Sequence, residues 1–193
     1  MELTTFSQDT RNTNIFFGGI KMALTKLAKK GYGQLELNFA TFRRKGAIEA
    51  QCKLADDIEF VENGMLLAVD RKNRTVGYPT GAADEIIALN YSTEHMYDER
   101  ERGLKYFKLD KNTFLPRLGY IGVSDKFTTN TVCYDGDEDT DLTTFAYGKP
   151  CATEGFEGYI ELVADKPEGF ALEILAITTM PDGQKAVKFA GLN

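Results

Sequence analysis

The feature that most constrains the fold is a long succession of short apolar segments separated by turns. Residues 35–39 alternate strictly between apolar and polar side chains, the period of a β-strand with one buried face. Residues 65–69 are continuously apolar and predict a strand buried on both faces. Proline and Asp-Gly turns, as in residues 180–183, are typical of hairpins. The strand signals cover residues 35–39, 47–52, 58–61, 65–69, 75–78, 86–91, 119–123, 127–134, 158–163, 170–175 and 185–189.

Helical segments do not alternate with these strands, which argues against a parallel doubly wound sheet. The pattern predicts a mainly β fold, an antiparallel β-barrel or sandwich with one helix against it. That helix is expected over residues 20–30, where Ile20, Leu24 and Leu27 recur at helical spacing. Lysines gather at its end and Gly31 provides a stop.

Residues 1–19 are predicted to form an extended N-terminal arm ahead of a single β-rich domain over residues 20–193. The arm is polar except near its end, where Ile15, Phe16 and Phe17 precede two glycines. Three large apolar side chains beside two glycines do not make a stable local element, so they are expected to dock. The docking surface is either the arm's own domain or a neighbouring subunit. Ile15, Phe16 and Phe17 are therefore the candidate partner-binding residues.

Charge and apolar content restrict the partners. The net charge of −6 and the sparse basic residues argue against direct binding to nucleic acid. The densest basic run is Arg43-Arg44-Lys45, which we interpret as a solvated loop. Apolar stretches stay well below the roughly 18–20 residues that span a bilayer, so no membrane association is expected. Three widely spaced cysteines and a polar N-terminus favour reduced thiols in a cytosol.

The acidic segment 135–141 carries five carboxylates and is the strongest candidate for a metal site. Asp135, Asp137 and Asp139 match the start of an EF-hand loop. The match then fails, because Thr140 occupies the position of the required glycine and Ala146 that of the bidentate glutamate. We therefore expect a solvated loop and no metal, with calcium binding as the alternative.

Residues that carry catalysis are scarce. His95 is the only histidine, and it is flanked by carboxylates but by no serine or cysteine motif that could supply a nucleophile. A zinc site would need further histidines or paired cysteines, which the sequence lacks. Glycine pairs are present without the ending of a phosphate-binding loop. The expectation is a protein of binding or assembly, without catalytic residues and without a cofactor.

Several segments together resemble structural proteins of tailed bacteriophages, in particular capsid decoration, cement or head auxiliary proteins. The resemblance is carried by the polar arm before its glycine pair, and by residues 65–70, 115–120, 123–130 and 180–184. Residues 123–127 are similar to a turn of small residue, Asp, cation and apolar residue found at barrel corners. Ser124 stands there in a position where glycine is frequent.

The resemblance implies a virion protein, made in the host cytoplasm, that binds the major capsid protein or other virion subunits as a homo-oligomer. A tail-tube, tail-terminator or head–tail adaptor subunit is the alternative within the same particle. A carbohydrate-binding or hydrolytic β-barrel is the alternative of another class, with Tyr97, Tyr106 or Tyr120 as stacking platforms.

Overall fold

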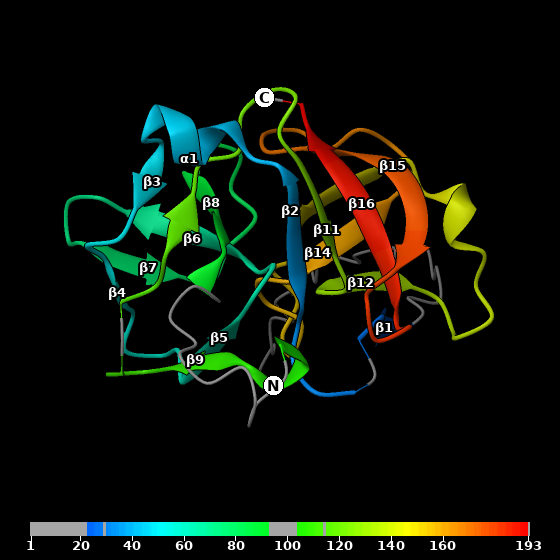
Figure 1. Cartoon of the computed structure of the whole chain (residues 1–193), viewed down its shortest axis with the longest axis horizontal. Helices are drawn as coiled ribbons and strands as arrows, with labels where there is room; N and C mark the ends of the chain where they lie inside the picture. The colour runs from blue at the N-terminus through cyan, green and yellow to red at the C-terminus, as the bar shows by residue number, and fades with distance from the viewer. Residues whose placement is uncertain (1–22, 29, 93–103, 114, 193) are drawn as a thin grey trace, which may run out of the picture.

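The computed structural model describes residues 23–28, 30–92, 104–113 and 115–192, which form three β-sheets (Figure 1). The eight-stranded sheet contains, in spatial order, β1 (Leu24–Lys26), β12 (Val132–Asp135), β14 (Ile160–Val163), β13 (Tyr147–Pro150), β15 (Leu172–Thr179), β16 (Lys185–Gly191), β11 (Lys126–Thr129) and β2 (Leu35–Phe39). The six-stranded sheet contains β3 (Ile48–Glu49), β10 (Leu118–Gly119), β8 (Ile87–Asn90), β6 (Leu66–Asp70), β7 (Thr75–Gly77) and β4 (Lys53–Leu54). The two-stranded sheet pairs β5 (Phe60–Glu62) with β9 (Lys108–Asp110).

The prediction of a mainly β, mostly antiparallel fold is confirmed. Among the strand pairs of the described residues, only β12–β14 and β4–β7 run parallel. The sheets do not form a closed barrel. Figure 1 shows the six-stranded sheet on one side and most of the eight-stranded sheet on the other, with β2 between them. The described part of the chain contains one short α-helix, α1 (Thr41–Lys45), and the 3₁₀ turns Leu104–Tyr106 and Leu142–Thr144, and Ser92 also has 3₁₀ conformation.

The apolar run in β6 is buried on both faces, as its sequence predicts. Leu66 belongs to a core with Phe127 and Phe189 of the eight-stranded sheet. Leu67 belongs to a second core with Ile58 on the other face. Successive side chains of a strand point to opposite faces, so one apolar strand contributes to both cores.

The predicted helix over residues 20–30 is wrong for the part that the structure describes. Leu24–Lys26 form strand β1, which pairs antiparallel with β12. The Thr25 hydroxyl donates a hydrogen bond to the carbonyl of Gly136, and the Lys26 amine lies 4.4 Å from the Tyr159 ring centroid. A helix of this length is marginal in water, whereas pairing satisfies the backbone groups on the edge of β12. Residues 1–19 lie outside the described residues.

The segment predicted as one strand over residues 127–134 is two strands, β11 and β12, separated by a corner. The Thr131 hydroxyl donates a 2.5 Å hydrogen bond to the carbonyl of Asn63, which precedes β6. The backbone N–H of Gln34, which precedes β2, donates to Asn130 Oδ1 at 2.7 Å. All four residues are buried. These contacts, which we call the Asn130 corner, join the eight-stranded sheet to the loop that leads into the six-stranded one.

We predict that Gly33→Ala destabilises the protein while Gly77→Ala does not. A Cβ on Gly33 would lie 2.0 Å from Thr131 Oγ1 and 2.7 Å from the Asn63 carbonyl oxygen. The corner would have to move, and overpacking of this kind costs about 1–3 kcal/mol. A Cβ on Gly77 would meet nothing within 4 Å. Urea denaturation of both variants measures the difference, and equal losses would contradict the tight fit at the corner.

Candidate interaction surface

The candidate partner-binding residues Ile15, Phe16 and Phe17 lie outside the described residues, and so does His95. The structure therefore does not test their predicted roles. The remaining candidates lie within the described ranges. They are the acidic segment 135–141, the cysteines and two of the three tyrosines.

The carboxylates of the acidic segment stabilise turns. Asp137 Oδ1 accepts hydrogen bonds from the Asp139 N–H at 3.1 Å and from the Thr140 hydroxyl at 3.2 Å. Asp141 accepts from the N–H of Thr143 at 3.0 Å, which lowers the pKa of the aspartate and caps a 3₁₀ turn. Within the described ranges, no group of three or more histidine, cysteine or acidic side chains is placed to hold a metal ion.

The cysteines are buried and reduced, and two of them lie on either side of β14. Cys133 is opposite Glu161 of β14, and the N–H of Cys151 donates to the carbonyl of Tyr159 beside the same strand. A hydrogen bond from Cys133 lowers the pKa of Cys151 to about 7 and raises that of Cys133. Neither side chain is exposed to solvent. The pair is enclosed by the second core, so it presents no nucleophile at the surface.

Two of the three tyrosines proposed as carbohydrate platforms are described. Tyr106 is 53% exposed, and the Lys105 amine lies 5.0 Å from its ring centroid. Tyr120 packs against the second core, with its hydroxyl oxygen buried and the Arg71 guanidinium 5.1 Å from its ring centroid. Tyr97 lies outside the described residues. The described chain thus brings no pair of these rings together on one open surface.

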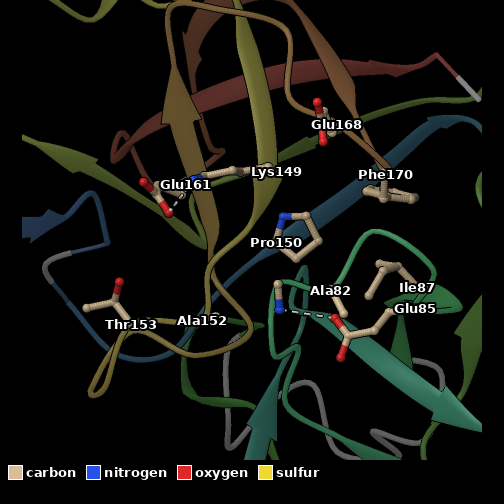
Figure 2. Close-up of a pocket in the computed structure, with 11 residues that line it drawn as sticks. Ala82, Glu85, Ile87, Lys149, Pro150, Ala152, Thr153, Glu161, Glu168 and Phe170 are labelled. Atoms are coloured by element: carbon tan, nitrogen blue, oxygen red, sulfur yellow. Dashed lines mark hydrogen bonds and ion pairs between the residues drawn. The ribbon is translucent and has the colours of Figure 1, made fainter.

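A small polar cleft of about 240 Å³ lies between the loop before β8 and strands β13 and β14. Figure 2 shows its carboxylates on different sides of Pro150. Glu85 accepts hydrogen bonds from the Thr80 N–H at 2.9 Å and from the Gly81 N–H at 3.2 Å. Lys149 Nζ lies 3.4 Å from Glu161 Oε2. Most of these charged groups thus already hold a turn or an ion pair.

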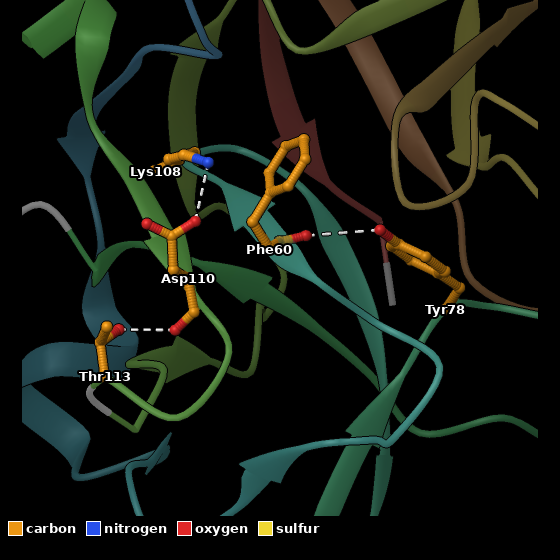
Figure 3. A network of polar contacts seen from close by, with 5 residues as sticks. All are labelled: Phe60, Tyr78, Lys108, Asp110 and Thr113. Atoms are coloured by element: carbon orange, nitrogen blue, oxygen red, sulfur yellow. Dashed lines mark hydrogen bonds and ion pairs between the residues drawn. The ribbon is translucent and has the colours of Figure 1, made fainter.

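The polar groups around β5 and β9 also serve the fold (Figure 3). Lys108 Nζ lies 2.8 Å from Asp110 Oδ1, and this contact raises the pKa of the lysine. The same amine lies 4.7 Å from the Phe60 ring centroid. The Tyr78 hydroxyl donates to the Phe60 carbonyl at 3.4 Å, and burial raises the pKa of Tyr78. The Lys108–Phe60 contact joins the two strands of this sheet, and the Tyr78 hydrogen bond joins β5 to the residue that follows β7.

The most distinctive surface of the described chain begins with a β-bulge in β2. Lys126 of β11 is opposite Phe39, and Thr128 is opposite Glu36, so two residues of β2 face Phe127 alone. Strict alternation would place Phe39 on the inner face with Leu37, which packs against the first core. The extra residue reverses the alternation, and Phe39 is 45% exposed.

Another apolar side chain is exposed on β15, beside a second bulge. Ile174 is opposite Phe189 and Ala176 is opposite Lys188, so Leu175 has no residue opposite it on β16. Ile174 packs against the first core, whereas Leu175 is 41% exposed. Leu175 follows the inward-facing Ile174 and points outwards by regular alternation, and the bulge brings Ile177 back to the inner face.

Val123 completes this surface from a tight turn between β10 and β11. The buried Asp125 accepts hydrogen bonds from the Gly122 N–H at 2.9 Å and from the Thr41 N–H at 2.5 Å. Ser124 has a φ of 75°, the left-handed conformation that glycine adopts most easily. The turn leaves Val123 65% exposed.

The basic run Arg43-Arg44-Lys45 forms most of helix α1, not the loop that we predicted. The helix begins at Thr41, whose N–H is held by Asp125, and it is anchored by the buried side chain of Phe42. The Arg44 guanidinium carbon lies 5.3 Å from the Phe39 ring centroid. The helix therefore places cations beside the first bulge.

Strands β2, β11, β15 and β16 and the turn at Val123 form one open groove of about 600 Å³, which we call the Phe39 groove. Its floor includes a register row that runs from Phe39 through Lys126 and Ala190 to Glu173. Its lining is completed by Val123, Ser124, Leu175, Gly191 and Leu192. An exposed apolar surface with a polar rim is typical of a binding surface for another protein.

Sequence reasoning missed this surface because the exposure of Phe39 depends on a bulge. Leu35-Glu36-Leu37-Asn38-Phe39 reads as one regular strand, and nothing in it marks the extra residue. In β15, two adjacent apolar residues, Ile174 and Leu175, interrupt the alternation. That interruption is the only signal that could have indicated an outward-facing leucine.

Comparison with known proteins gave no relationship. No protein-family model matches the chain. Neither the curated proteins nor the solved structures provided a significant match. In the part of the chain that the structure describes, no helix has the length and apolar character needed to span a membrane.

We predict that Asp125→Ala destabilises the fold, whereas Asp84→Ala has little effect. Removing the Asp125 carboxylate leaves the N–H groups of Thr41 and Gly122 without their acceptor, which costs about 2–4 kcal/mol for two partly buried donors. Asp84 is exposed and provides the matched control. Thermal and urea unfolding measure the loss. An unchanged midpoint for Asp125→Ala would show that the turn does not depend on this carboxylate.

Proposed function

We propose that this protein is a structural subunit of a phage particle that binds and stabilises the capsid shell, with no catalytic role. The observation that carries the proposal is the Phe39 groove, an apolar surface formed by Phe39 at the bulge of β2, by Leu175 of β15 and by a fixed turn at Val123. The sequence resemblance to capsid decoration proteins indicates which class of partner is involved.

The energetics of such a surface suit assembly. Complete burial of a side chain such as Phe39 or Leu175 contributes about 1.5–3 kcal/mol relative to full exposure, and both are already half-buried. One groove alone therefore gives weak attachment. A shell presents many equivalent sites, and an oligomer that engages several of them gains affinity without any single strong contact.

The charge of the molecule also fits this role. A net charge of −6 keeps separate copies soluble and apart before they reach a particle. The cations of α1 lie beside the groove, where they oppose this overall sign locally. The net negative charge makes copies of the protein repel one another at long range, whereas the groove and its neighbouring cations attract a complementary surface at short range. Together these effects favour association with a specific partner over aggregation.

We predict that the full-length protein co-sediments with its cognate capsid shells and that Phe39→Glu reduces the bound fraction. A carboxylate at the floor of an apolar contact is costly to bury, so binding falls about tenfold or more. Tyr106→Glu is the matched control, because Tyr106 is also an exposed aromatic residue but lies outside the groove.

Wild-type protein that stays in the supernatant while its cognate shells sediment would contradict the proposal. Capture by isolated tails in that case would favour the tail-tube, tail-terminator or adaptor alternative. Equal losses for the two variants would show that the groove is not the surface used. Circular dichroism confirms that each variant keeps its β-sheet signal before binding is measured.

A further inference from the structure

We propose that the segment of the shell protein that occupies the Phe39 groove combines large apolar side chains with carboxylates at one end, and that helix α1 binds these carboxylates. The inference rests on the proposed function and names the chemistry of the partner at the same surface. It follows from the way in which charges are arranged along the groove.

The Phe39 ring lies between two neighbouring hollows of different character. On one side is the Phe39 groove, where Val123 and Leu175 provide exposed apolar surface. On the other side is an open depression of about 670 Å³ whose lining includes Arg43 and Arg44. The Arg44 guanidinium carbon lies 5.3 Å from the Phe39 ring centroid. A segment that lies across the ring therefore contacts the apolar groove and the arginines together.

The end of the groove beside α1 carries more cations than carboxylates. Arg43-Arg44-Lys45 is exposed along α1, and Lys126 is opposite Phe39 in the strand register. Strand β2 contributes one exposed carboxylate, Glu36, three residues from Phe39. This local excess of positive charge stands out in a chain whose net charge is −6. It attracts an anionic group to this end of the groove.

The opposite end of the groove carries the opposite sign. Glu173 is exposed on β15, and Ala190 separates it from Lys126 in the register row. Two strand spacings put the backbones of Lys126 and Glu173 roughly 10 Å apart. The buried Ala190 forms an uncharged floor between them. The groove thus runs from a positive end at α1 to a negative end at β15.

An apolar segment with carboxylates at one end matches this order of charges. Its apolar side chains would cover Ala190 between Val123 and Leu175, and its carboxylates would face the guanidinium groups of α1. A guanidinium binds a carboxylate through two parallel hydrogen bonds, which fix orientation as well as sign. A segment with cations at that end would instead bring like charges together. The groove therefore selects the charge of its partner in addition to its apolar surface.

An NMR titration of the full-length protein with two synthetic peptides tests the inference without shells. One peptide is Asp-Asp-Gly-Leu-Phe-Leu, and the other carries two lysines in place of the aspartates, both with blocked termini. We expect the acidic peptide to bind about threefold or more tighter, the scale for two exposed ion pairs. It should shift the amide signals of residues 39–44, 123–126 and 190–192. Equal or tighter binding of the lysine peptide would overturn the inference, and so would the absence of these shifts at millimolar peptide.

Charge reversal shows whether α1 is the source of the preference. The double change Arg43→Glu and Arg44→Glu should abolish or invert the preference for the acidic peptide. The double change Lys72→Glu and Lys166→Glu is the matched control, because it alters the net charge equally at exposed residues outside the groove. Circular dichroism verifies the β-sheet signal of both variants. An α1 variant that is folded and keeps the wild-type preference would contradict the role of the helix.

Shell co-sedimentation of the same proteins at increasing salt separates this inference from the proposed function. We expect shell binding to weaken as salt screens the contacts of α1. Protein that prefers the acidic peptide but ignores shells contradicts the capsid role and retains the charge preference of the groove. Shell binding that is insensitive both to salt and to the α1 double change contradicts the charge preference and retains the capsid role.

Discussion

The hydrogen bonds at the Asn130 corner are the constraint on which the rest of the structure depends. Thr131 is tied to Asn63 and Asn130 is tied to Gln34, and all of these groups are buried. Buried polar groups must find partners, and hydrogen bonds are directional, so these contacts fix the angle at which β11 leaves β12. β11 pairs with β2 on one side and with β16 on the other, so its position also sets the position of the strands that form the floor of the groove.

The groove shows how small departures from regular pairing can convert a covering sheet into a contact surface. Without the extra residue in β2, Phe39 would point towards the first core, as Leu37 does. Exposing two large apolar side chains has no advantage for a protein that acts alone. An exposed apolar surface of this kind is typical of a site that contacts another protein, which is why the groove carries the proposed role.

Periodicity predicts the strands well because it reports burial directly. The strand over residues 35–39 has the bounds of β2, and the apolar run of β6 serves two cores as expected. The same reasoning failed for β1, because the apolar spacing of Leu24 and Leu27 fits a helix equally well. Residues 24–26 form a strand because they pair with the edge of β12, which lies more than a hundred positions away in the sequence. The groove could not be predicted for a similar reason, because a bulge is defined by the pairing with another strand. The turn at Val123 likewise depends on a distant contact, since Asp125 accepts a hydrogen bond from the Thr41 N–H.

The bulge in β2 also limits how copies can grow together. β2 is the last strand of its sheet, and an edge strand normally offers a ladder to any passing strand. The extra residue breaks the regular spacing of that ladder, and at the opposite edge β1 is only three residues long. Sheet-to-sheet polymerisation is thereby discouraged at both ends. An oligomer of this chain, as proposed, would then form through contacts between side chains, whose geometry can close into a ring of finite size and need not extend into a fibre.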